Sequence, residues 1–458
     1  MAQKPSIPKG TRDFSPSEVN KRNYIFDVVK KHFQIYGFQP IETPSFENSE
    51  TLMGKYGDEG DRLIFKILNS GDFLNKVNDE LYSTKDSSAL TSKISEKALR
   101  YDLTVPFARY VVMHQNEIDF PFKRYQIQPV WRADRPQKGR FREFFQCDAD
   151  VVGSDSLLQE VELVQLYDAV FTDLKLDGVT IKLNNRKILA GIAEVIGERD
   201  KLIDFTVALD KLDKIGIEGV SKEMREKNIS VVAINKAAPL FALKGTNLEQ
   251  LSVLGNLLKD SEEGSKGVGE LRFIIETLEE LGLQSANLKI DVTLARGLNY
   301  YTGAIFEVAA PEGVSMGSIG GGGRYDDLTG IFGLKDVSGV GISFGLDRIY
   351  LVLEELGLFP EAIDQSLQVL CVNFGDKEAL TSLKLVNQLR RAGIKCDLYP
   401  SSAKMQKQMK YANNRNVPYV VLIGEQELAG NSFVVKDMVK GGQKTYSLDT
   451  PELFYKGL

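Results

Sequence analysis

Residues 296–303 read Arg-Gly-Leu-Asn-Tyr-Tyr-Thr-Gly, and residues 320–326 read Gly-Gly-Gly-Gly-Arg-Tyr-Asp. The first block places one arginine and two adjacent tyrosines beside glycines. The second block is a glycine run, which lets bare backbone approach a ligand closely. Together they predict a pocket that holds a small polar molecule against an anion. Taken alone, the glycine run is equally typical of a flexible loop.

A predicted hairpin with a basic loop precedes these blocks. Residues 122–134 and 141–152 are rich in aromatic and β-branched side chains, which favours two antiparallel strands. Five cations fall within eleven residues at their junction: Arg132, Arg135, Lys138, Arg140 and Arg142. Because alternate strand residues share a face, we expect Arg132, Arg140 and Arg142 to point the same way. Such a cluster suits a polyphosphate, and an exposed basic loop is the alternative.

Polar residues alternate along the second strand of this hairpin. Gln146, Asp148 and Asp150 are spaced to lie on one face, either toward solvent or as the polar floor of a site. Asp102 and Thr104 come just before a predicted helix. They could contact a ligand or act as an ordinary helix cap.

A glycine-containing strand at 339–344 leads into a helix predicted over 345–356, with Arg348 in its first turn. A helix N-terminus with an arginine attracts anions, although this motif is weak by itself. The sequence has neither of the common glycine-rich phosphate loops. His32 and His114, the two histidines of the chain, fit no metal-ligand spacing and no catalytic triad. A bound nucleotide would therefore be held by arginines on an antiparallel sheet.

The order of predicted elements divides the chain. Strands and helices alternate up to about residue 184, residues 190–286 are helical, and strands return from residue 288. We expect the strands on both sides of the helical segment to share one antiparallel sheet. After a linker at 357–365, a βαβαβ pattern predicts a compact α/β domain.

Local predictions in the first part are more specific. An apolar run predicts a strand at 62–68, and the polar stretch 69–96 is expected to be a mobile loop. A helix over 156–174 is expected to be capped by Ser154 or Asp155.

Composition narrows the class of protein. The chain has 458 residues, 43% of them hydrophobic, and no apolar run approaches the ~20 residues that span a bilayer. Its first residues lack the apolar core of a signal peptide, and its three scattered cysteines fit a reducing cytosol, so we expect a cytoplasmic location. Residues 366–458 carry a net charge of +5 and the remainder −11. This contrast is compatible with a polyanion at one end or with a merely solvated basic surface.

Three segments together resemble the signature motifs of class II aminoacyl-tRNA synthetases: the strand around Pro44, the hairpin from Arg132 to Glu143, and the stretch from Gly341 to Arg348. The two opening blocks closely resemble the signatures of the histidyl-tRNA synthetase family. Residues 99–106 match that family as well. The resemblance covers almost the whole chain.

The resemblance implies an ATP-dependent histidine–tRNA ligase that forms histidyl-adenylate and then charges tRNA(His). Arg132, Arg140 and Arg348 match ATP-binding arginines, and Arg296 matches an arginine beside the α-phosphate. The matching histidine-binding residues fall into two groups. Asp102, Thr104 and Gln146 correspond to residues that bind the α-amino group, and Asp150, Tyr300 and Tyr301 to residues around the imidazole.

The resemblance also implies an architecture and partners. We expect an α+β catalytic domain built on an antiparallel sheet (residues 1–190 and 287–360), a helical insertion (191–286) and a C-terminal α/β anticodon-binding domain (366–458). Mg²⁺ would accompany ATP, with no metal site of the protein's own. Pro44 matches a proline at a homodimer interface, and Gln137 resembles a position near the tRNA acceptor end.

Some residues depart from the family pattern. Asn299 stands where the family usually has an acid, which puts a local salt bridge in question, and Trp131 and Ala133 are unusual beside Arg132. Two other functions are considered: a non-catalytic regulatory relative and a class II synthetase for another amino acid. The presence of the site residues opposes the first, and the Tyr300–Tyr301 block opposes the second.

Overall fold

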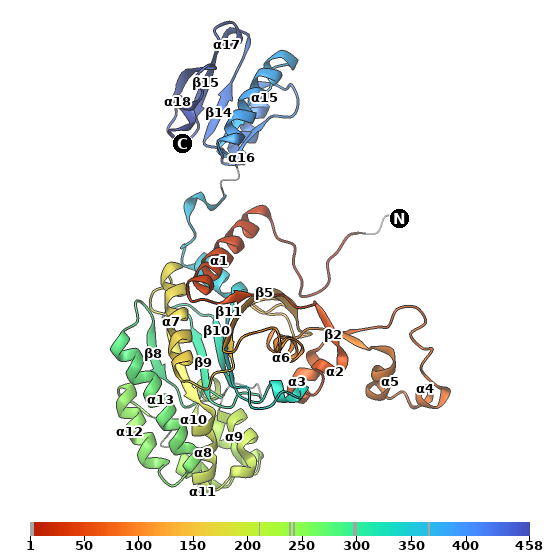
Figure 1. The fold of residues 1–458 in the computed structure, drawn as a ribbon, viewed down its shortest axis with the longest axis vertical. Helices are drawn as coiled ribbons and strands as arrows, with labels where there is room; N and C mark the ends of the chain where they lie inside the picture. The colour runs from red at the N-terminus through yellow and green to blue at the C-terminus, as the bar shows by residue number, and fades with distance from the viewer. Residues whose placement is uncertain (1–3, 210, 238–239, 241–242, 296–299, 365–366) are drawn as a thin grey trace. The chain divides into compact units, whose positions relative to one another are not determined.

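The structure, a computed structural model, describes residues 4–209, 211–237, 240, 243–295, 300–364 and 367–458 (Figure 1). The chain divides into two compact units. The first comprises Met1–Asp13 and Arg22–Leu358, and the second comprises Phe14–Lys21 and Phe359–Leu458. Within the described ranges, no helix combines the length and apolar character that crossing a membrane requires.

An eight-stranded sheet forms the centre of the first unit, in the order β1-β5-β6-β11-β10-β9-β7-β8. β1 pairs with β5, and β7 with β8, in parallel, whereas the other neighbours are antiparallel. Strands from before and after the helical segment thus share one sheet, as the sequence predicted. The strands are β1 (Gln39–Pro40), β5 (Phe122–Trp131), β6 (Glu143–Val152), β7 (Thr180–Asn185), β8 (Asn287–Ile290), β9 (Ala304–Ala309), β10 (Gly320–Tyr325) and β11 (Gly339–Gly345).

The sheet has one apolar and one polar face. Residues directly opposite on neighbouring strands point to the same face, so apolar residues of β6 and β11 line one side and polar residues of β5 and β6 line the other. On the apolar face, Phe344 of β11 lies opposite Cys147 of β6. The ring centroid of Phe344 lies 5.8 Å from that of Phe33 in α1 (Pro16–Ile35) and 4.8 Å from that of Tyr167 in α7 (Leu158–Asp173). The polar face carries Gln146, Asp148 and Asp150 of β6, opposite Gln128, Gln126 and Arg124 of β5. This face provides the floor of the candidate site.

The glycine run is a central strand of the sheet and not a flexible loop. β10 pairs with β11 along its whole length and with β9 over its four glycines. A Cβ on Gly322 would lie 2.0 Å from the carbonyl oxygen of Gly341, so only bare backbone fits there. The absence of side chains therefore permits close strand pairing.

Arg324 of the same block points to the helix-covered side. Its Nε and Nη2 each donate a 2.5 Å hydrogen bond to the buried carboxylate of Glu160 in α7. Its Nη1 and Nη2 donate to the carbonyl oxygens of Ser154 and Ser156. The predicted capping of this helix by Ser154 or Asp155 is wrong, since the N-cap position is Leu157 and no side chain caps it. The buried arginine fixes this turn instead.

A small sheet and short helices lie between β1 and β5, and two predictions fail here. Residues 62–68 are not one strand: α3 occupies Gly57–Leu63, and only Lys66–Ile67 (β3) is extended. The stretch 69–96 contains two helices rather than only loop, capped by Asn78 and Asp86. The remaining elements are β2 (Phe46–Asn48), β4 (Lys97–Leu99), α2 (Ser49–Leu52), α4 (Asp79–Thr84), α5 (Ser87–Ile94), α6 (Thr104–Met113) and the 3-10 turn η3 (Thr329–Phe332).

The segment between β7 and β8 is helical where it is described, as predicted. Helices α8 and α13 approach closely, because a Cβ on Gly191 would lie 2.4 Å from Cα of Gly264. The elements are α8 (Arg186–Ile196), η1 (Arg199–Lys201), α9 (Leu202–Leu209), α10 (Leu212–Glu226), α11 (Val231–Ala237), α12 (Asn247–Leu257) and α13 (Glu262–Leu281). After β11, α14 (Leu346–Glu355) completes the first unit.

The second unit contains a five-stranded sheet in the order β13-β12-β14-β15-β16. β12 pairs in parallel with β13 and β14, and β15 pairs antiparallel with β14 and β16. The predicted α/β fold is confirmed, and the sequence missed the short α17 and α18. The elements are η4 (Glu361–Asp364), β12 (Val369–Cys371), α15 (Asp376–Arg391), β13 (Cys396–Leu398), α16 (Met405–Asn414), β14 (Tyr419–Leu422), α17 (Glu425–Ala429), β15 (Ser432–Asp437), β16 (Gln443–Ser447) and α18 (Glu452–Tyr455).

Candidate active site

Asp150 is a buried carboxylate on the polar face of the sheet. Its Oδ1 accepts a 2.6 Å hydrogen bond from the hydroxyl of Tyr325. Arg124 Nη2 lies 2.9 Å from its Oδ2, an ion-pair distance, although the angle does not suit a hydrogen bond. A Cβ on Gly341 would come within 1.9 Å of Oδ1, so the neighbouring strand makes room for this carboxylate. Burial raises the pKa of Asp150, and the positive charge of Arg124 opposes that rise.

Gln146 and Asp148 continue the same row of side chains. Gln146 Nε2 lies 3.4 Å from both carboxylate oxygens of Asp148 and donates a 3.3 Å hydrogen bond to Ser343 Oγ. Burial raises the pKa of Asp148 to about 7, and Asp150 adds to the rise while Arg124 opposes it. The alternation seen in the sequence therefore produces a polar floor and not a solvent-facing edge.

Asp102 forms a second buried carboxylate centre at the start of α6. Oδ1 accepts hydrogen bonds from the Tyr56 hydroxyl at 2.8 Å and from the Val105 backbone N–H at 3.2 Å. The N-cap position of α6 is Leu103, so Asp102 lies one residue before it, where its carboxylate accepts from a first-turn N–H and also contacts aromatic hydroxyls. Burial raises the pKa of this carboxyl, while Tyr56 and Arg132 lower it. Thr104, half-buried, is the first residue of the helix.

The two tyrosines of the opening block have different surroundings. The Tyr300 hydroxyl lies 3.4 Å from Oδ2 of Asp102, with a further contact to Thr104. The hydrogen-bond partner of Asp150 is Tyr325, whose ring centroid lies 6.3 Å from that of Tyr300 in an edge-on arrangement. The expectation that Tyr300 and Asp150 lie around the imidazole stays a prediction. The ring of Tyr301 lies against β10, where a Cβ on Gly323 would be 2.7 Å from its Cδ1. Burial raises the pKa of the Tyr300 hydroxyl well above its usual value, so it stays protonated at neutral pH.

The basic residues of the hairpin lie in the connection between the strands, since β5 ends at Trp131 and β6 begins at Glu143. The expectation that Arg132, Arg140 and Arg142 share a strand face is therefore wrong. Arg132 is half-buried, and its guanidinium lies 4.2 Å from the centroid of the Tyr101 ring. Arg140 is exposed near the tip of the connection and pairs with Asp134 at 3.2 Å. Arg142 points its Nε to the carbonyl oxygen of Asp134.

Arg348 reaches the tip of this connection from the first turn of α14. Its Nε donates a 3.2 Å hydrogen bond to the carbonyl oxygen of Gly139, and Nη1 donates a 2.5 Å bond to that of Ser318. Gly139 has a φ of +71°, and a Cβ there would lie 3.1 Å from Cγ of Arg348. The structure thus joins the predicted anion site of α14 to the basic hairpin. Arg296 and Asn299 lie outside the described residues.

The other chemically reactive residues lie in structural roles. His32 Nε2 is 2.9 Å from Asp173, and His114 Nδ1 is 2.8 Å from Glu117. All three cysteines are buried as free thiols. Among the residues that the structure describes, no group of three or more His, Cys, Asp or Glu side chains could hold a metal ion.

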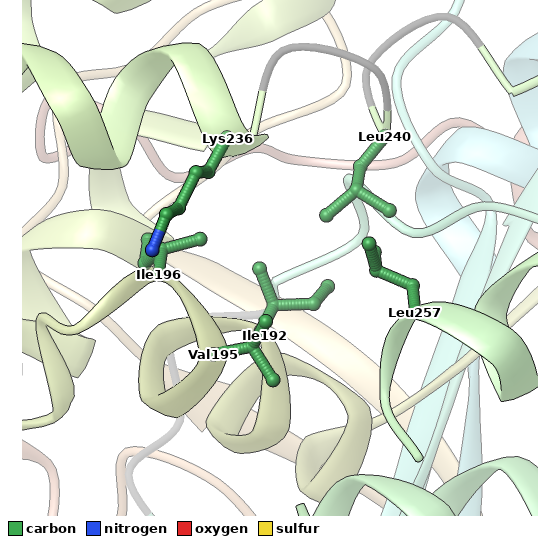
Figure 2. A pocket seen from close by; sticks show the side chains of 6 residues that line it. All are labelled: Ile192, Val195, Ile196, Lys236, Leu240 and Leu257. Carbon is green, nitrogen blue, oxygen red and sulfur yellow. The ribbon is translucent and has the colours of Figure 1, made fainter. Parts of the chain in front are cut away.

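An apolar pocket lies elsewhere, in the helical segment, and Figure 2 shows its side chains. Among the described residues that line it, Lys236 alone is charged and the others are apolar, which does not suit histidine or ATP. The lining residues are Ile192, Val195, Ile196, Lys236, Leu240 and Leu257.

Comparisons with known proteins identify the family of the chain. A family model described as histidyl-tRNA synthetase matches residues 83–349, which is more than half of the chain. The chain belongs to the histidyl-tRNA synthetase family. A model described as an anticodon binding domain matches residues 367–452. The central sheet with its helices is therefore a class II synthetase catalytic fold, and the second unit contains the anticodon-binding fold.

Similar proteins cover nearly the full length. The histidine–tRNA ligase of Christiangramia forsetii is 72% identical over 97% of both chains, and that of Flavobacterium johnsoniae is 67% identical with the same coverage. The crystal structure of histidyl-tRNA synthetase from Nostoc sp. PCC 7120 superposes with a TM-score of 0.83 at 31% identity, covering all of both chains. These relatives favour a catalytic protein over the regulatory relative considered above.

Three residues of the site were missed by the sequence analysis: Tyr56, Arg124 and Tyr325. Tyr325 stood inside the quoted glycine block, and Arg124 was spaced two and four residues before polar Gln126 and Gln128 on the same strand. That period-2 pattern could have revealed Arg124. Tyr56 gave no such signal, because its contact with Asp102 depends on the path of α2 and α3.

Proposed function

We propose that this protein is a histidine–tRNA ligase that activates L-histidine with ATP and then transfers it to the 3′ end of tRNA(His). The observation that carries the proposal is the Asp150 centre: a buried carboxylate, held by Tyr325 and Arg124, above a strand of glycines. A fixed acceptor of this kind suits one N–H of an imidazole ring. A competing amino acid without that N–H would leave the buried acceptor unpaired, which gives strong discrimination.

The α-amino group of histidine is assigned to Asp102, Thr104 and Gln146. Asp102 supplies a carboxylate for an ammonium group, and the hydroxyl of Thr104 and the amide of Gln146 supply further polar contacts. Tyr300 is proposed to lie between this group and the imidazole, since its hydroxyl is 3.4 Å from Asp102 and its ring centroid is 6.3 Å from that of Tyr325. Tyr301, which packs on the backbone of Gly323, is proposed to line the ring site.

ATP is proposed to be bound by arginines. Arg132 is the proposed partner of the α-phosphate, Arg140 of the far phosphates, and Arg348 packs on the nucleotide. Arg296, which matches a family arginine beside the α-phosphate, completes this set. Negative charge grows on the transferring group when the histidine carboxylate attacks the α-phosphorus and pyrophosphate leaves, and fixed cations stabilise that charge. Mg²⁺ would enter with ATP, bound to its phosphates.

The reaction needs no nucleophile from the protein. The carboxylate of histidine is the nucleophile in the first step, and a ribose hydroxyl of tRNA is the nucleophile in the second. The protein contributes by holding carboxylate and phosphorus in line, which converts two encounters into one oriented step.

The remaining proposals concern architecture and partners. We divide the chain into a catalytic domain (1–190 and 287–360), a helical insertion (191–286) and an anticodon-binding domain (366–458). Residues 366–458 carry a net charge of +5, which favours contact with RNA, whose bases are read individually. We further propose a homodimer with Pro44 at the interface, Gln137 near the acceptor end of tRNA, and a cytoplasmic location, where tRNA and ATP are consumed.

The test is aminoacylation. Purified protein, labelled histidine, MgATP and a tRNA(His) transcript are expected to give charged tRNA, whereas Asp150→Asn should charge at a far lower rate. A tRNA for another amino acid serves as the control. Failure of the wild-type protein to charge tRNA(His) would refute the proposal.

A further inference from the structure

A segment before α1 lies across the basic connection of the hairpin. The backbone N–H of Arg142 donates a 2.9 Å hydrogen bond to the carbonyl oxygen of Gly10, and its Nη1 lies 3.5 Å from that of Lys9. Gly10 has a φ of +89°, and a Cβ there would lie 2.8 Å from Cγ of Arg142 and 3.0 Å from Pro136. A glycine is therefore required at this crossing for conformation and for space. We call residues 9–12 the strap.

Two backbone hydrogen bonds link the strap to Arg132, which is proposed to bind ATP. Arg142 donates to Gly10 through its N–H, and its own carbonyl oxygen accepts a 3.0 Å hydrogen bond from the N–H of Arg132. Strap, Arg142 and Arg132 thus form a continuous row of backbone pairs. The base of the connection, where Arg132 stands, is held by that row.

Arg12 links the strap to the second ATP element. Its guanidinium lies 3.3 Å from the centroid of the Phe141 ring, and its Nη2 donates a 2.5 Å hydrogen bond to Oδ1 of Asp347. Asp347 is the residue before Arg348, whose Nε in turn donates to Gly139 at the tip of the connection. Through Arg12, the strap touches both the hairpin connection and the first turn of α14.

The burial of these groups indicates what removal of Arg12 would do. The Asp347 side chain is 6% exposed and also pairs with Arg22, which is 8% exposed, at 2.6 Å. The Arg12 side chain is 28% exposed. Asp347 would therefore keep a buried cation if Arg12 were lost, so the fold would not be left with an unpaired buried charge.

We infer that the strap positions the ATP-binding arginines, with Arg12 as a positioning residue that fixes the hairpin connection to α14. This rests on the proposed function. ATP affinity and the adenylation rate depend on where Arg132, Arg140 and Arg348 lie, and a displacement of about 1 Å can cost up to ~100-fold in rate. The proposed histidine-binding carboxylates Asp102 and Asp150 are instead held by residues outside the strap, namely Tyr56, Val105, Tyr300, Tyr325 and Arg124. Changes in the strap should consequently alter the KM for ATP and not the KM for histidine.

The experiment is histidine-dependent ATP–pyrophosphate exchange with one substrate varied at a time. Arg12→Ala is expected to raise KM for ATP on the order of tenfold and to lower the rate, while KM for histidine stays within about twofold. Arg12→Lys keeps the charge and should recover part of the loss. The matched control is Arg272→Ala, which removes a partly exposed arginine of α13 and should behave as the wild type.

Gly10→Ala is the second variant, because it disturbs the crossing without touching the Arg12–Asp347 pair. It should give the same rise in KM for ATP, and thermal denaturation checks that both variants are folded. An active wild type together with unchanged KM for ATP in Arg12→Ala, or equal changes for ATP and histidine, would overturn this inference alone. A wild type without exchange would overturn the proposed function instead.

Discussion

The hydroxyl of Tyr325 donates a 2.6 Å hydrogen bond to Oδ1 of Asp150, and both residues are buried. Tyr325 belongs to the glycine block of β10, and Asp150 belongs to β6, with β11 between them. This bond fixes the orientation of a carboxylate whose other oxygen faces Arg124. The acceptor proposed for the imidazole is thus built from three strands and not from one motif.

Tyr325→Phe tests the orientation of Asp150. The variant keeps the ring that packs on Gly339 and removes only the hydroxyl. A hydrogen bond to a charged group is worth roughly 1.5–3 kcal/mol, so KM for histidine should rise about ten- to hundredfold with KM for ATP nearly unchanged. Exchange kinetics measure both constants. An equal loss for both substrates would show that Tyr325 acts on the fold rather than on Asp150.

Gly341→Ala tests the space that β11 leaves for the same carboxylate. The added Cβ would lie 1.9 Å from Oδ1 of Asp150, so the carboxylate must move. We expect kcat/KM for histidine to fall on the order of a hundredfold. Gly269→Ala in α13 is the control, because a Cβ there has no neighbour within 4 Å. Wild-type kinetics in Gly341→Ala would contradict the placement of Asp150.

Asp148→Asn tests the buried charge on the polar face. Because the folded pKa, about 7, lies above the usual 3.8, folding favours the protonated carboxyl. Its favourable contribution is complete below about pH 4 and is lost as the pH rises through about 7. Asn mimics the protonated form, so the variant should be more stable than the wild type at pH 8, by up to a few kcal/mol. Urea denaturation should show this difference shrinking toward pH 4, and a pH-independent difference would be inconsistent with a buried titrating carboxyl.

Glu160→Gln tests the buried pair behind the glycine block. The change takes the buried carboxylate from the Arg324 guanidinium, which is 5% exposed, and leaves it the more distant Asp326 at 3.8 Å. Breaking a buried ion pair on one side costs about 3–5 kcal/mol, so the thermal unfolding midpoint should drop by several degrees. Lys222→Ala removes a surface pair with a 4.0 Å separation and should have almost no effect. Similar midpoints for the two variants would show that the Glu160–Arg324 pair contributes no more to stability than a surface pair.

The sequence predicted the hairpin, the shared sheet and the α/β fold of the second unit because long segments with clear periodicity determine them. It did not predict the strand at residues 320–325, since glycines carry no side-chain pattern and only the neighbouring strands define this one. It failed at 62–68 because a short apolar run does not distinguish a strand from the end of a helix. The caps Asn78 and Asp86 were visible as N-terminal signals, but the helices they begin bury no side chain and gave little periodicity.

The sequence predicted those parts of the site whose residues are close together in the chain. Alternating Gln146, Asp148 and Asp150 fall on one face as expected, whereas the partners of Asp102 and Asp150 come from distant segments. Tyr300 lies beside Asp102 because the chain folds back over α6, which no local pattern specifies. The sequence does not mark that the strands end at Trp131 and Glu143, so Arg132, Arg140 and Arg142 were expected on a shared strand face.

Amino-acid-dependent ATP–pyrophosphate exchange is the measurement closest to the chemistry proposed for Asp150 and the arginines. Each standard amino acid would be supplied in turn to the wild-type protein with MgATP and labelled pyrophosphate. Exchange with histidine, and background levels with the others, is the expected result. Exchange supported equally by another amino acid, or none with histidine, would contradict the assignment of this site to histidine activation.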